Sequence, residues 1–262
     1  MNEMEKYGNL AVIINQIRLE HPTMSLRSLY ELIKPEGMGR DKFISYCCEL
    51  GLNQVKQFKP LRTTDSSGVI RFDNLLTNLN ITRINQVWSS DITYYQIGEN
   101  VYYLTFILDN YSRMILGWSV SESLKTEHTT LPALKMAVKN RKGVNLKGLI
   151  FHSDGGGQYY AKIFLDYTEE MEFRNSMCEY AYENGKAERI NGIIKNNYLK
   201  YWKSSDLRSL SKNVDRACTN YNLEKPHKSL KKLSPIIFER NLINLQQQTK
   251  PEVMESFYGK RC

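Results

Sequence analysis

Three apolar stretches in residues 87–121 determine the kind of sheet that this chain can form. The stretches VWSSDITYYQI (87–97), VYYLTFILD (101–109) and MILGWSVS (114–121) are rich in aromatic and β-branched residues, which favour strands. Only short turns separate them, the first at residues 98–100. Strands joined so closely pair antiparallel. The sequence therefore predicts a three-stranded antiparallel meander.

The next part of the chain alternates between helical and extended patterns. Helical spacing of apolar residues occurs at 126–141, 158–171 and 184–200, and short strand-like runs occur at 148–154 and 174–177. The resulting order, βββαβαβα, predicts an α/β fold in which helices flank a mixed sheet.

Three helical patterns precede the strands, at residues 8–20, 25–34 and 40–50. A proline and two glycines at 35–39 break the chain between the second and the third. Helix, short glycine-containing turn and helix form the outline of a helix-turn-helix. Any small helical bundle shares this outline, so DNA binding and a purely structural role both remain open for this segment.

These changes in sequence pattern divide the chain into four parts. We predict a helical, helix-turn-helix-like domain at 1–53, followed by a linker at 54–85 that contains the turn cluster TTDSSG. The α/β core is expected at 86–204, and a basic helical extension at 205–262.

The net charge of +8 is concentrated near the carboxyl end of the sequence. Residues 181–262 hold 16 Lys and Arg against 8 Asp and Glu, whereas residues 1–90 and 91–180 carry +2 and −2. An excess of positive charge favours an anionic partner such as nucleic acid. For any single residue the alternative is a solvated basic surface. Candidates for phosphate contacts are Lys186, Arg189, Lys195, Lys200, Lys203, Lys225, Lys228, Lys231 and Lys232.

Nothing in the sequence favours a membrane or secreted protein. No run approaches the ~18 apolar residues of a membrane span, and the start MNEMEKYGNL lacks the basic-then-apolar pattern of a signal peptide. The five cysteines include no CxxC pair, which argues against a disulfide framework or a thiolate zinc site. We therefore expect a cytoplasmic protein with reduced thiols and no membrane partner.

Three carboxylates occupy positions that call for a physical reason. Asp91 lies inside the first predicted strand, where aspartate is unfavourable. Asp154 ends an apolar strand ahead of three glycines, and open α/β sheets bind ligands at the carboxyl ends of their strands. Glu188 lies on a predicted helix. Taken singly, each has an ordinary alternative: a strand edge facing solvent, a strand-to-helix turn and a solvated helix face.

Together the three carboxylates suggest a metal site. Two aspartates on adjacent strands and one helical glutamate could hold two divalent cations, roughly 3.5–4 Å apart in two-metal sites, for in-line displacement at phosphorus. Oxygen ligands suit Mg²⁺ or Mn²⁺. At ~100° per residue, Asn184, Asn191 and Lys195 share the helix face of Glu188. The Lys195 ammonium could contact a phosphate near the metals.

Five stretches of the sequence match one known family in its own order. They are WSSDITYY (88–95), LDNYSRMILGW (108–118), FHSDGGGQY (151–159), SMCEYAYENGKAERINGIIKNNYL (176–199) and YNLEKPHKSLKKLSP (221–235). With these stretches the chain resembles the DDE transposases that have a retroviral-integrase-type catalytic core. The likeness is greatest to bacterial insertion-sequence transposases encoded by a downstream reading frame, the "insertion sequence three" group. The spacing of 34 residues between Asp154 and Glu188 is similar to that of the family.

The resemblance implies an RNase H-like fold in which Asp91, Asp154 and Glu188 are the catalytic, metal-binding triad and Lys195 is the basic residue after the glutamate. It implies that Asp109 is structural or supports the site from behind. The segment around Tyr221 and His227 is a family signature whose role the sequence does not explain. The resemblance also places five residues near the site, namely His152, Ser153, Gly156, Gln158 and Asn184.

Two positions depart from the family pattern. Gly155 stands where the family often has arginine, so a DNA contact of the family lacks its side chain in this sequence, and Cys178 stands where serine is common. Residues 8–52 resemble the short helix-turn-helix-like segment that begins the downstream frame. Recognition of the element ends could therefore depend on a separate or fused upstream-frame DNA-binding polypeptide.

The resemblance implies a transposase that cleaves DNA and transfers strands at the ends of a mobile element, with two Mg²⁺ or Mn²⁺ ions in the active complex. It also implies a homo-oligomer assembled on element ends and target DNA, in the nucleoid of a bacterium. Two alternatives remain open: an RNase H-like nuclease or resolvase that cuts without joining, and a transposase-derived DNA-binding protein without catalysis. An integrase with an N-terminal zinc domain is disfavoured, because the first 80 residues contain no His-His-Cys-Cys arrangement.

Overall fold

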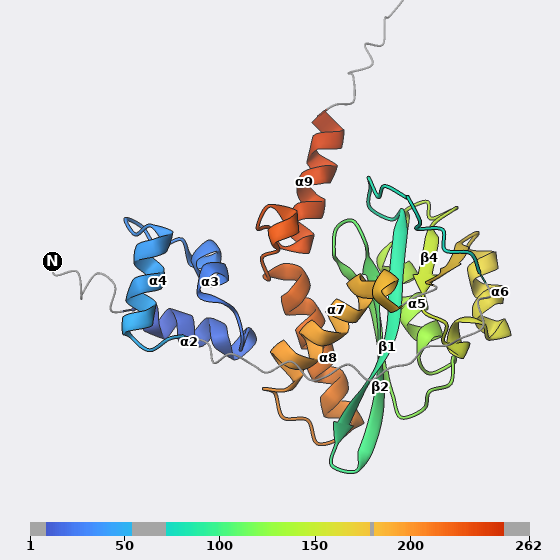
Figure 1. Ribbon diagram of the computed structural model, residues 1–262, viewed down its shortest axis with the longest axis horizontal. Coiled ribbons are helices and arrows are strands. Elements are labelled where there is room, and N and C mark those ends of the chain that lie inside the picture. Colours follow the sequence, from blue (N-terminus) through green and yellow to red (C-terminus); the bar gives the residue numbers. More distant parts are fainter. Residues whose placement is uncertain (1–8, 54–71, 179–180, 249–262) are drawn as a thin grey trace, which may run out of the picture.

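The computed structural model describes residues 9–53, 72–178 and 181–248 of the chain. A mixed sheet of five strands forms its centre (Figure 1). The strands lie side by side in the order β3-β2-β1-β4-β5. Their bounds are β1 (Val87–Ile97), β2 (Asn100–Asp109), β3 (Ile115–Ser121), β4 (Ile150–Ser153) and β5 (Arg174–Met177).

The directions of the strands confirm the predicted mixed sheet. Strands β1, β2 and β3 form the antiparallel meander, with Asp91 opposite Phe106 on β2. Strand β4 pairs parallel with β1 and β5 pairs parallel with β4, so β4 and β5 belong to crossover units that contain helices. This strand order and these directions are those of an RNase H-like sheet.

Helices cover both faces of the sheet, because its strands alternate apolar side chains between two cores. On β2, the Ile107 side chain faces the core under helices α5 (Thr130–Asn140) and α6 (Lys162–Glu170). Its neighbours Phe106 and Leu108 face the opposite core. That second core lies under α7 (Gly185–Ile194), the π-helical turn η3 (Lys195–Leu199) and α8 (Leu207–Leu223).

The sequence placed most of these elements within a few residues, and two predicted helices differ from the observed ones. The helix expected at 158–171 divides into a 3-10 turn, η1 (Gly157–Tyr159), and α6. The helix expected at 184–200 changes from α to π geometry at Lys195. Such one-turn π segments are frequent at functional sites.

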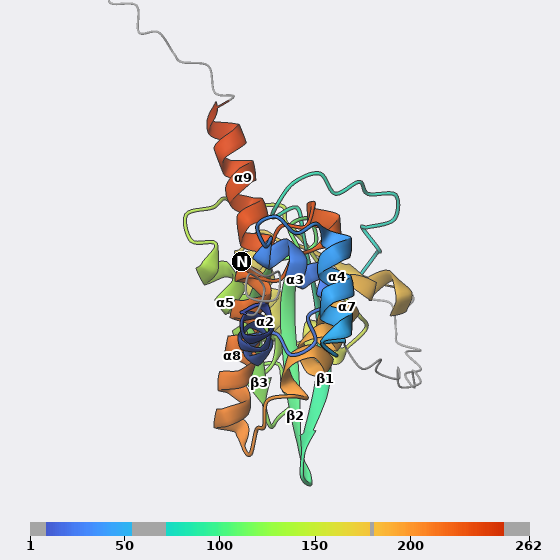
Figure 2. The ribbon, with the colours of Figure 1, turned by 90° about the vertical axis from the view of Figure 1, so that its left-hand side faces the viewer.

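The amino-terminal helices share a small core of their own. Helices α2 (Leu10–Glu20), α3 (Leu26–Ile33) and α4 (Arg40–Glu49) surround the fully buried Phe43. The Ser25 side chain caps α3 by accepting the Ser28 N–H. Figure 2 views the molecule from the side of these helices. The predicted linker 54–85 is described only from residue 72 onward, and there it contacts the core, since the Leu75 N–H donates to the Ser176 hydroxyl at 2.9 Å.

The predicted extension at 205–262 is described up to residue 248, and two helices form most of that part. An aspartate–serine capping box, Asp206 with Ser209, begins α8. After the irregular segment EKPHKSL, Pro235 begins α9 (Pro235–Gln248), consistent with the preference for proline in the first turn of a helix. Helix α9 extends away from the sheet (Figures 1 and 2). Among the described residues, no helix is long and apolar enough to cross a membrane.

Candidate active site

Strands β1 and β4 bring the two aspartates to neighbouring positions. Their parallel register pairs Trp88 with Phe151 and Ser89 with His152. Two residues further along the same register, Asp91 is next to Asp154, which directly follows the carboxyl end of β4. The two aspartates therefore occupy neighbouring positions where β4 ends beside β1, and the sequence had placed them on adjacent strands.

Helix α7 places its polar face against this part of β1. The Asn191 side-chain amide donates to Asp91 Oδ2 at 2.7 Å, and the Asn184 amide donates to the Ser90 carbonyl oxygen at 2.8 Å. These two bonds fix the helix beside the aspartates, and Glu188 lies between the two asparagines in the sequence. The polar face inferred from helical spacing is thus the face that meets β1.

The three carboxylates act on one another electrostatically. Burial, followed by the charges of Asp154 and Glu188, raises the pKa of Asp91 to about 7, although the Asn191 hydrogen bond opposes this shift. The pKa of Asp154 is also raised, first by burial and then by Glu188, against the effect of the Gly156 N–H that donates to it. Buried carboxylates whose pKa values are raised in this way mark a candidate functional site.

The loop after β4 is shaped around Asp154. The Gly156 N–H donates to Asp154 Oδ1 at 3.1 Å. A Cβ atom on Gly156 would lie 3.1 Å from both Asp154 Oδ1 and Gln158 Oε1, so any larger residue would press on these two side chains. One residue after Gln158, the buried Tyr159 shares a 2.9 Å hydrogen bond with the Ser90 hydroxyl. This bond ties the loop to β1, one residue before Asp91.

Lys195 reaches β1 from the end of α7. Its ammonium donates to Thr93 Oγ1 at 2.6 Å and to the Tyr94 carbonyl oxygen at 3.3 Å, and it lies 5.3 Å from the centre of the Tyr94 ring. Burial lowers its pKa, while the charge of Asp91 opposes that shift. The lysine is therefore held two residues along β1 from the first carboxylate. Sequence reasoning did not identify Thr93 or Tyr94, because only the π turn brings Lys195 to them.

Two further residues predicted near the site lie in the strand that supports it. His152 is fully buried and its Nδ1 lies 3.0 Å from the Ser176 hydroxyl on β5, while burial lowers its pKa to about 4. The imidazole is therefore neutral at physiological pH. Ser153 is buried and its hydroxyl donates to the Asp154 carbonyl oxygen at 3.2 Å.

Asp109 is the structural residue that the family resemblance implied. Its buried carboxylate accepts the N–H groups of Asn85 at 2.6 Å, Tyr111 at 2.8 Å and Ser112 at 3.0 Å. It fixes the turn between β2 and β3, as aspartate does in turns of this kind.

The donor set of the site fits a hard divalent cation. Asp91, Asp154 and Glu188 offer only carboxylate oxygens, which suit Mg²⁺, and a cation would offset the repulsion that raises the pKa of Asp91. Within the described ranges, no three His, Cys, Asp or Glu side chains stand in an arrangement that could hold a metal ion. The residue types are thus compatible with a divalent cation, whereas the described side chains do not form a metal-binding arrangement.

The predicted basic residues do not form one surface. Lys186, Arg189, Lys225 and Lys228 line one cavity, together with Arg113, which sequence reasoning missed. Lys200 and Lys203 line a separate hollow beside Trp202. Lys231 and Lys232 follow in left-handed backbone conformation, and Lys232 forms an ion pair with Glu31 of α3.

Comparison with known families agrees with the geometry. Two descriptions of the "Integrase core domain" match, one over residues 81–182 and one over residues 170–235. The first contains Asp91 and Asp154, and the second contains Glu188 and the basic segment after it.

Curated relatives are insertion-sequence proteins of bacteria. The Shigella sonnei transposase for IS629 is 30% identical over 194 residues, 70% of this chain and 63% of that protein. A Mycobacterium tuberculosis putative transposase for IS986/IS6110 is 31% identical over 58% of this chain and 57% of its own length. The chain thus spans less than two thirds of these relatives. The 31 kDa protein of insertion element IS600 from Shigella sonnei is 31% identical over 77% of this chain and 75% of that protein.

Solved structures show more distant similarity. The catalytic core domain of HTLV-2 integrase, in complex with magnesium, has a TM-score of 0.47 and 21% identity over 59% of this chain and 95% of its own. A chain of the simian T-cell lymphotropic virus intasome has a TM-score of 0.49 and 17% identity over 91% of this chain and 79% of its own. The sequence relationship to the IS600 protein spans three quarters of that protein, and the integrase core domain descriptions together match residues 81–235. These relationships show that the chain belongs to the DDE transposases of bacterial insertion sequences, with an integrase core domain.

Proposed function

We propose that this transposase cleaves DNA strands at the ends of its mobile element and joins them to target DNA, with Asp91, Asp154 and Glu188 as its catalytic carboxylates. The observation that carries the proposal is the electrostatic coupling of these three groups where β1, β4 and α7 meet. Burial and neighbouring negative charge raise the pKa values of Asp91 and Asp154, and keeping such buried carboxylates ionised costs a fold stability. Their presence in this family's core is explained by a role in binding divalent cations.

The proposed reaction has two displacement steps at phosphorus. In the first, a water oxygen bonds to the phosphorus while the P–O3′ bond breaks, which frees a 3′-hydroxyl. In the second, that 3′-hydroxyl attacks a phosphodiester of the target and the target's own 3′-oxygen leaves. Two Mg²⁺ or Mn²⁺ ions, when bound, would activate the attacking oxygen and stabilise the leaving oxygen.

The chain's own residues would position these groups. Asp91 and Asp154 hold the metal-binding edge of the sheet, and Asn191 orients the Asp91 carboxylate through its 2.7 Å hydrogen bond. Lys195, fixed by Thr93, would supply a positive charge to a DNA phosphate beside the metals.

The assembly of the active complex belongs to the same proposal. Two element ends must be brought together, which requires at least two copies of the chain on DNA. We also propose that an upstream-frame polypeptide contributes to recognition of the ends, and that the complex acts on the nucleoid in the bacterial cytoplasm.

The Asp154→Asn variant tests the catalytic site. It removes one metal-binding charge with almost no change of shape, so strand cleavage of element-end DNA in Mg²⁺ should fall at least about 100-fold. The exposed Asp166 on α6 provides the matched control, since Asp166→Asn makes the same chemical change away from the site. Cleavage by Asp154→Asn at the rate of the control would refute the proposed site.

A further inference from the structure

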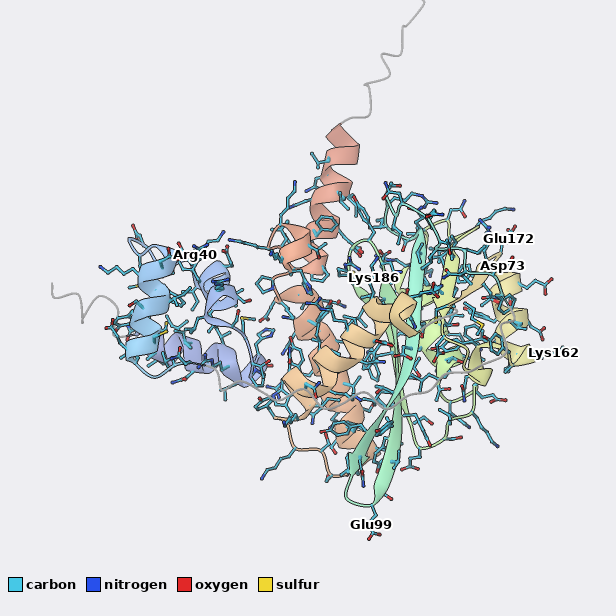
Figure 3. The ribbon with its side chains drawn as sticks, in the orientation of Figure 1. Arg40, Asp73, Glu99, Lys162, Glu172 and Lys186 are labelled. Carbon is cyan, nitrogen blue, oxygen red and sulfur yellow. The ribbon has the colours of Figure 1, made fainter. Side chains whose placement is uncertain are left out.

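A cavity with several cationic lining residues lies against α7 and is not part of the carboxylate site. It has a volume of 660 Å³ and is bounded by the start of α7, the turn after β2 and the segment 225–229 that follows α8. Lys186, labelled in Figure 3, extends into it from α7. At ~100° per residue, the α7 residues that line the cavity, including Lys186, Arg189 and Ile193, face away from Glu188 and Asn191.

The charge of this cavity has one sign. Five cationic side chains line it and, among the described lining residues, none is acidic. Desolvation lowers the pKa values of Arg113 and Lys186, while the charge of the buried Asp109 opposes that shift. Asp109 does not line the cavity, however, and its carboxylate already accepts three backbone N–H groups. The cationic lining residues are Arg113, Lys186, Arg189, Lys225 and Lys228.

Burial of these positive charges close together lowers the stability of the DNA-free protein. Lys225 is half-buried, and desolvation together with the charge of Arg189 lowers its pKa. Desolvation and the charges of Lys225, Arg113 and Arg189 lower the pKa of His227 to about 3, so its ring stays neutral. Like charges held together with little counter-charge weaken a fold. An anion that enters the cavity would remove that cost.

The backbone holds the cluster in place. The Lys225 N–H donates to the Asn220 carbonyl at 3.2 Å, and the His227 N–H donates to the Leu233 carbonyl at 3.0 Å. The His227 ring packs edge-on against the buried Tyr221, with ring centres 4.8 Å apart. The signature segment whose role the sequence left unexplained therefore forms a fixed wall that presents Lys225 and Lys228 to the cavity.

The cavity also offers the positive charge and the hydrogen-bond donors that bind phosphate. Gly185, the first residue of α7, lines the cavity, so the positive end of the helix dipole adds to the side-chain charges. Arg113 and Arg189 can each donate two parallel hydrogen bonds to phosphate oxygens. A cavity with these donors suits an anion that presents several oxygens, such as a DNA phosphodiester.

We propose that this cavity binds a backbone phosphate of the DNA on the side of α7 opposite the carboxylates, so that one helix contacts DNA through both faces. The proposal rests on the proposed function, because it assumes that DNA is the substrate. It assigns the signature segment at 221–228 to DNA positioning and adds Arg113 as a phosphate contact.

The test uses a pair of substitutions remote from the carboxylates. Arg113→Gln with Lys225→Gln removes two cavity charges, and the control pair Lys139→Gln with Lys142→Gln removes two charges at exposed positions at the end of α5. Binding of a fluorescent duplex carrying the element end is measured over a range of salt concentrations. We expect the cavity pair to weaken binding at least about fivefold and to reduce the salt slope by about 0.9 for each phosphate that the protein no longer neutralises. The control pair should leave both quantities near those of the unmodified protein.

A charge-preserving pair separates weaker phosphate binding from damage to the fold. Arg113→Lys with Lys225→Arg should retain most of the binding, and the Gln pair should not lower the thermal midpoint of the DNA-free protein, because it relieves repulsion. A salt slope equal to that of the control pair would overturn the proposal. A second result would also overturn it. If inorganic phosphate binds in the cavity but the Gln pair binds DNA as tightly as the unmodified protein, the cavity is a site for small anions and not for DNA.

The same experiment distinguishes failure of this proposal from failure of the proposed function. If the unmodified protein cleaves element-end DNA and Asp154→Asn does not, an unchanged salt slope in the cavity pair rejects the cavity alone. If the unmodified protein neither binds nor cleaves that DNA in Mg²⁺, both proposals fail.

Discussion

Asp91 shows how the interior of this fold acts on a single side chain. Its carboxylate is desolvated and faces two other carboxylates, so its pKa rises to about 7. Sequence reasoning singled out Asp91 because aspartate is unfavourable inside strands, and Asp154 because of the glycines that follow, and it proposed a metal site only from these two together with Glu188. It could not identify Arg113, which enters the basic cavity from a turn in left-handed backbone conformation, because that position depends on the packing of α7 against β2.

The raised pKa of Asp91 predicts a gain in stability when its charge is removed. In metal-free buffer at pH 8, Asp91→Asn should raise the free energy of unfolding by roughly 1–3 kcal/mol. The native carboxyl binds its proton more tightly than the unfolded one, so the unmodified protein loses stability as pH rises from about 4 to about 7. The advantage of the variant should therefore shrink toward zero near the unfolded pKa of about 4.

Urea unfolding at several pH values, with a chelator present, measures this difference. Added Mg²⁺ should raise the thermal midpoint of the unmodified protein and have a smaller effect on Asp91→Asn. A variant less stable than the parent at about pH 8 would contradict the electrostatic description of the site.

At the scale of elements, the sheet was predictable because its strands alternate apolar residues between two cores and are joined by short turns. The divisions of the predicted helices were not predictable, since they follow contacts between distant parts of the chain. The Tyr160 ring, between η1 and α6, stacks on Phe72 with centres 5.8 Å apart. The π turn at Lys195 accompanies the bond of that lysine to Thr93 on β1.

Strand β3 packs so closely on α5 that one position requires glycine. A Cβ atom on Gly117 would lie 2.1 Å from the Ala133 carbonyl oxygen and 2.8 Å from the Ala137 nitrogen, both backbone atoms that cannot rotate away. We expect Gly117→Ala to lower the free energy of unfolding by about 2–4 kcal/mol. Gly157→Ala is the control, because its added Cβ meets nothing within 4 Å, and its effect should stay within about 0.5 kcal/mol. Equal effects of the two substitutions in chemical denaturation would show that the helix and strand can separate.

At the scale of the whole molecule, the amino-terminal helices dock on the end of the core through polar contacts. His21 lies 3.1 Å from the Tyr198 hydroxyl and 2.8 Å from a Glu224 carboxylate oxygen. Arg216 of α8 pairs with Glu20 and lies 4.3 Å from the centre of the Trp202 ring. Local sequence patterns predicted the three helices. They could not predict where the helices dock, because the contacting residues of the core lie far away in the sequence.

Removing Arg216 should loosen this docking without unfolding either part. Arg216→Ala deletes an ion pair whose side chains are 42% and 43% exposed and a contact with Trp202, so we expect a loss of only about 1 kcal/mol. Hydrogen exchange of α2 should become faster while that of the central strands stays the same. Faster exchange throughout the sheet would mean that the contact stabilises the core itself.

The central claim is that this one chain both cuts and joins DNA, and strand transfer tests it most directly. Element-end DNA with a labelled, pre-cleaved 3′-hydroxyl is incubated with a supercoiled target plasmid, Mg²⁺ and the unmodified protein, Asp154→Asn or Asp166→Asn. We predict labelled plasmid with the unmodified protein and with Asp166→Asn, and none with Asp154→Asn. Cleavage of uncut ends without any joining of the pre-cleaved ones would identify a nuclease and would contradict the proposed transposase reaction.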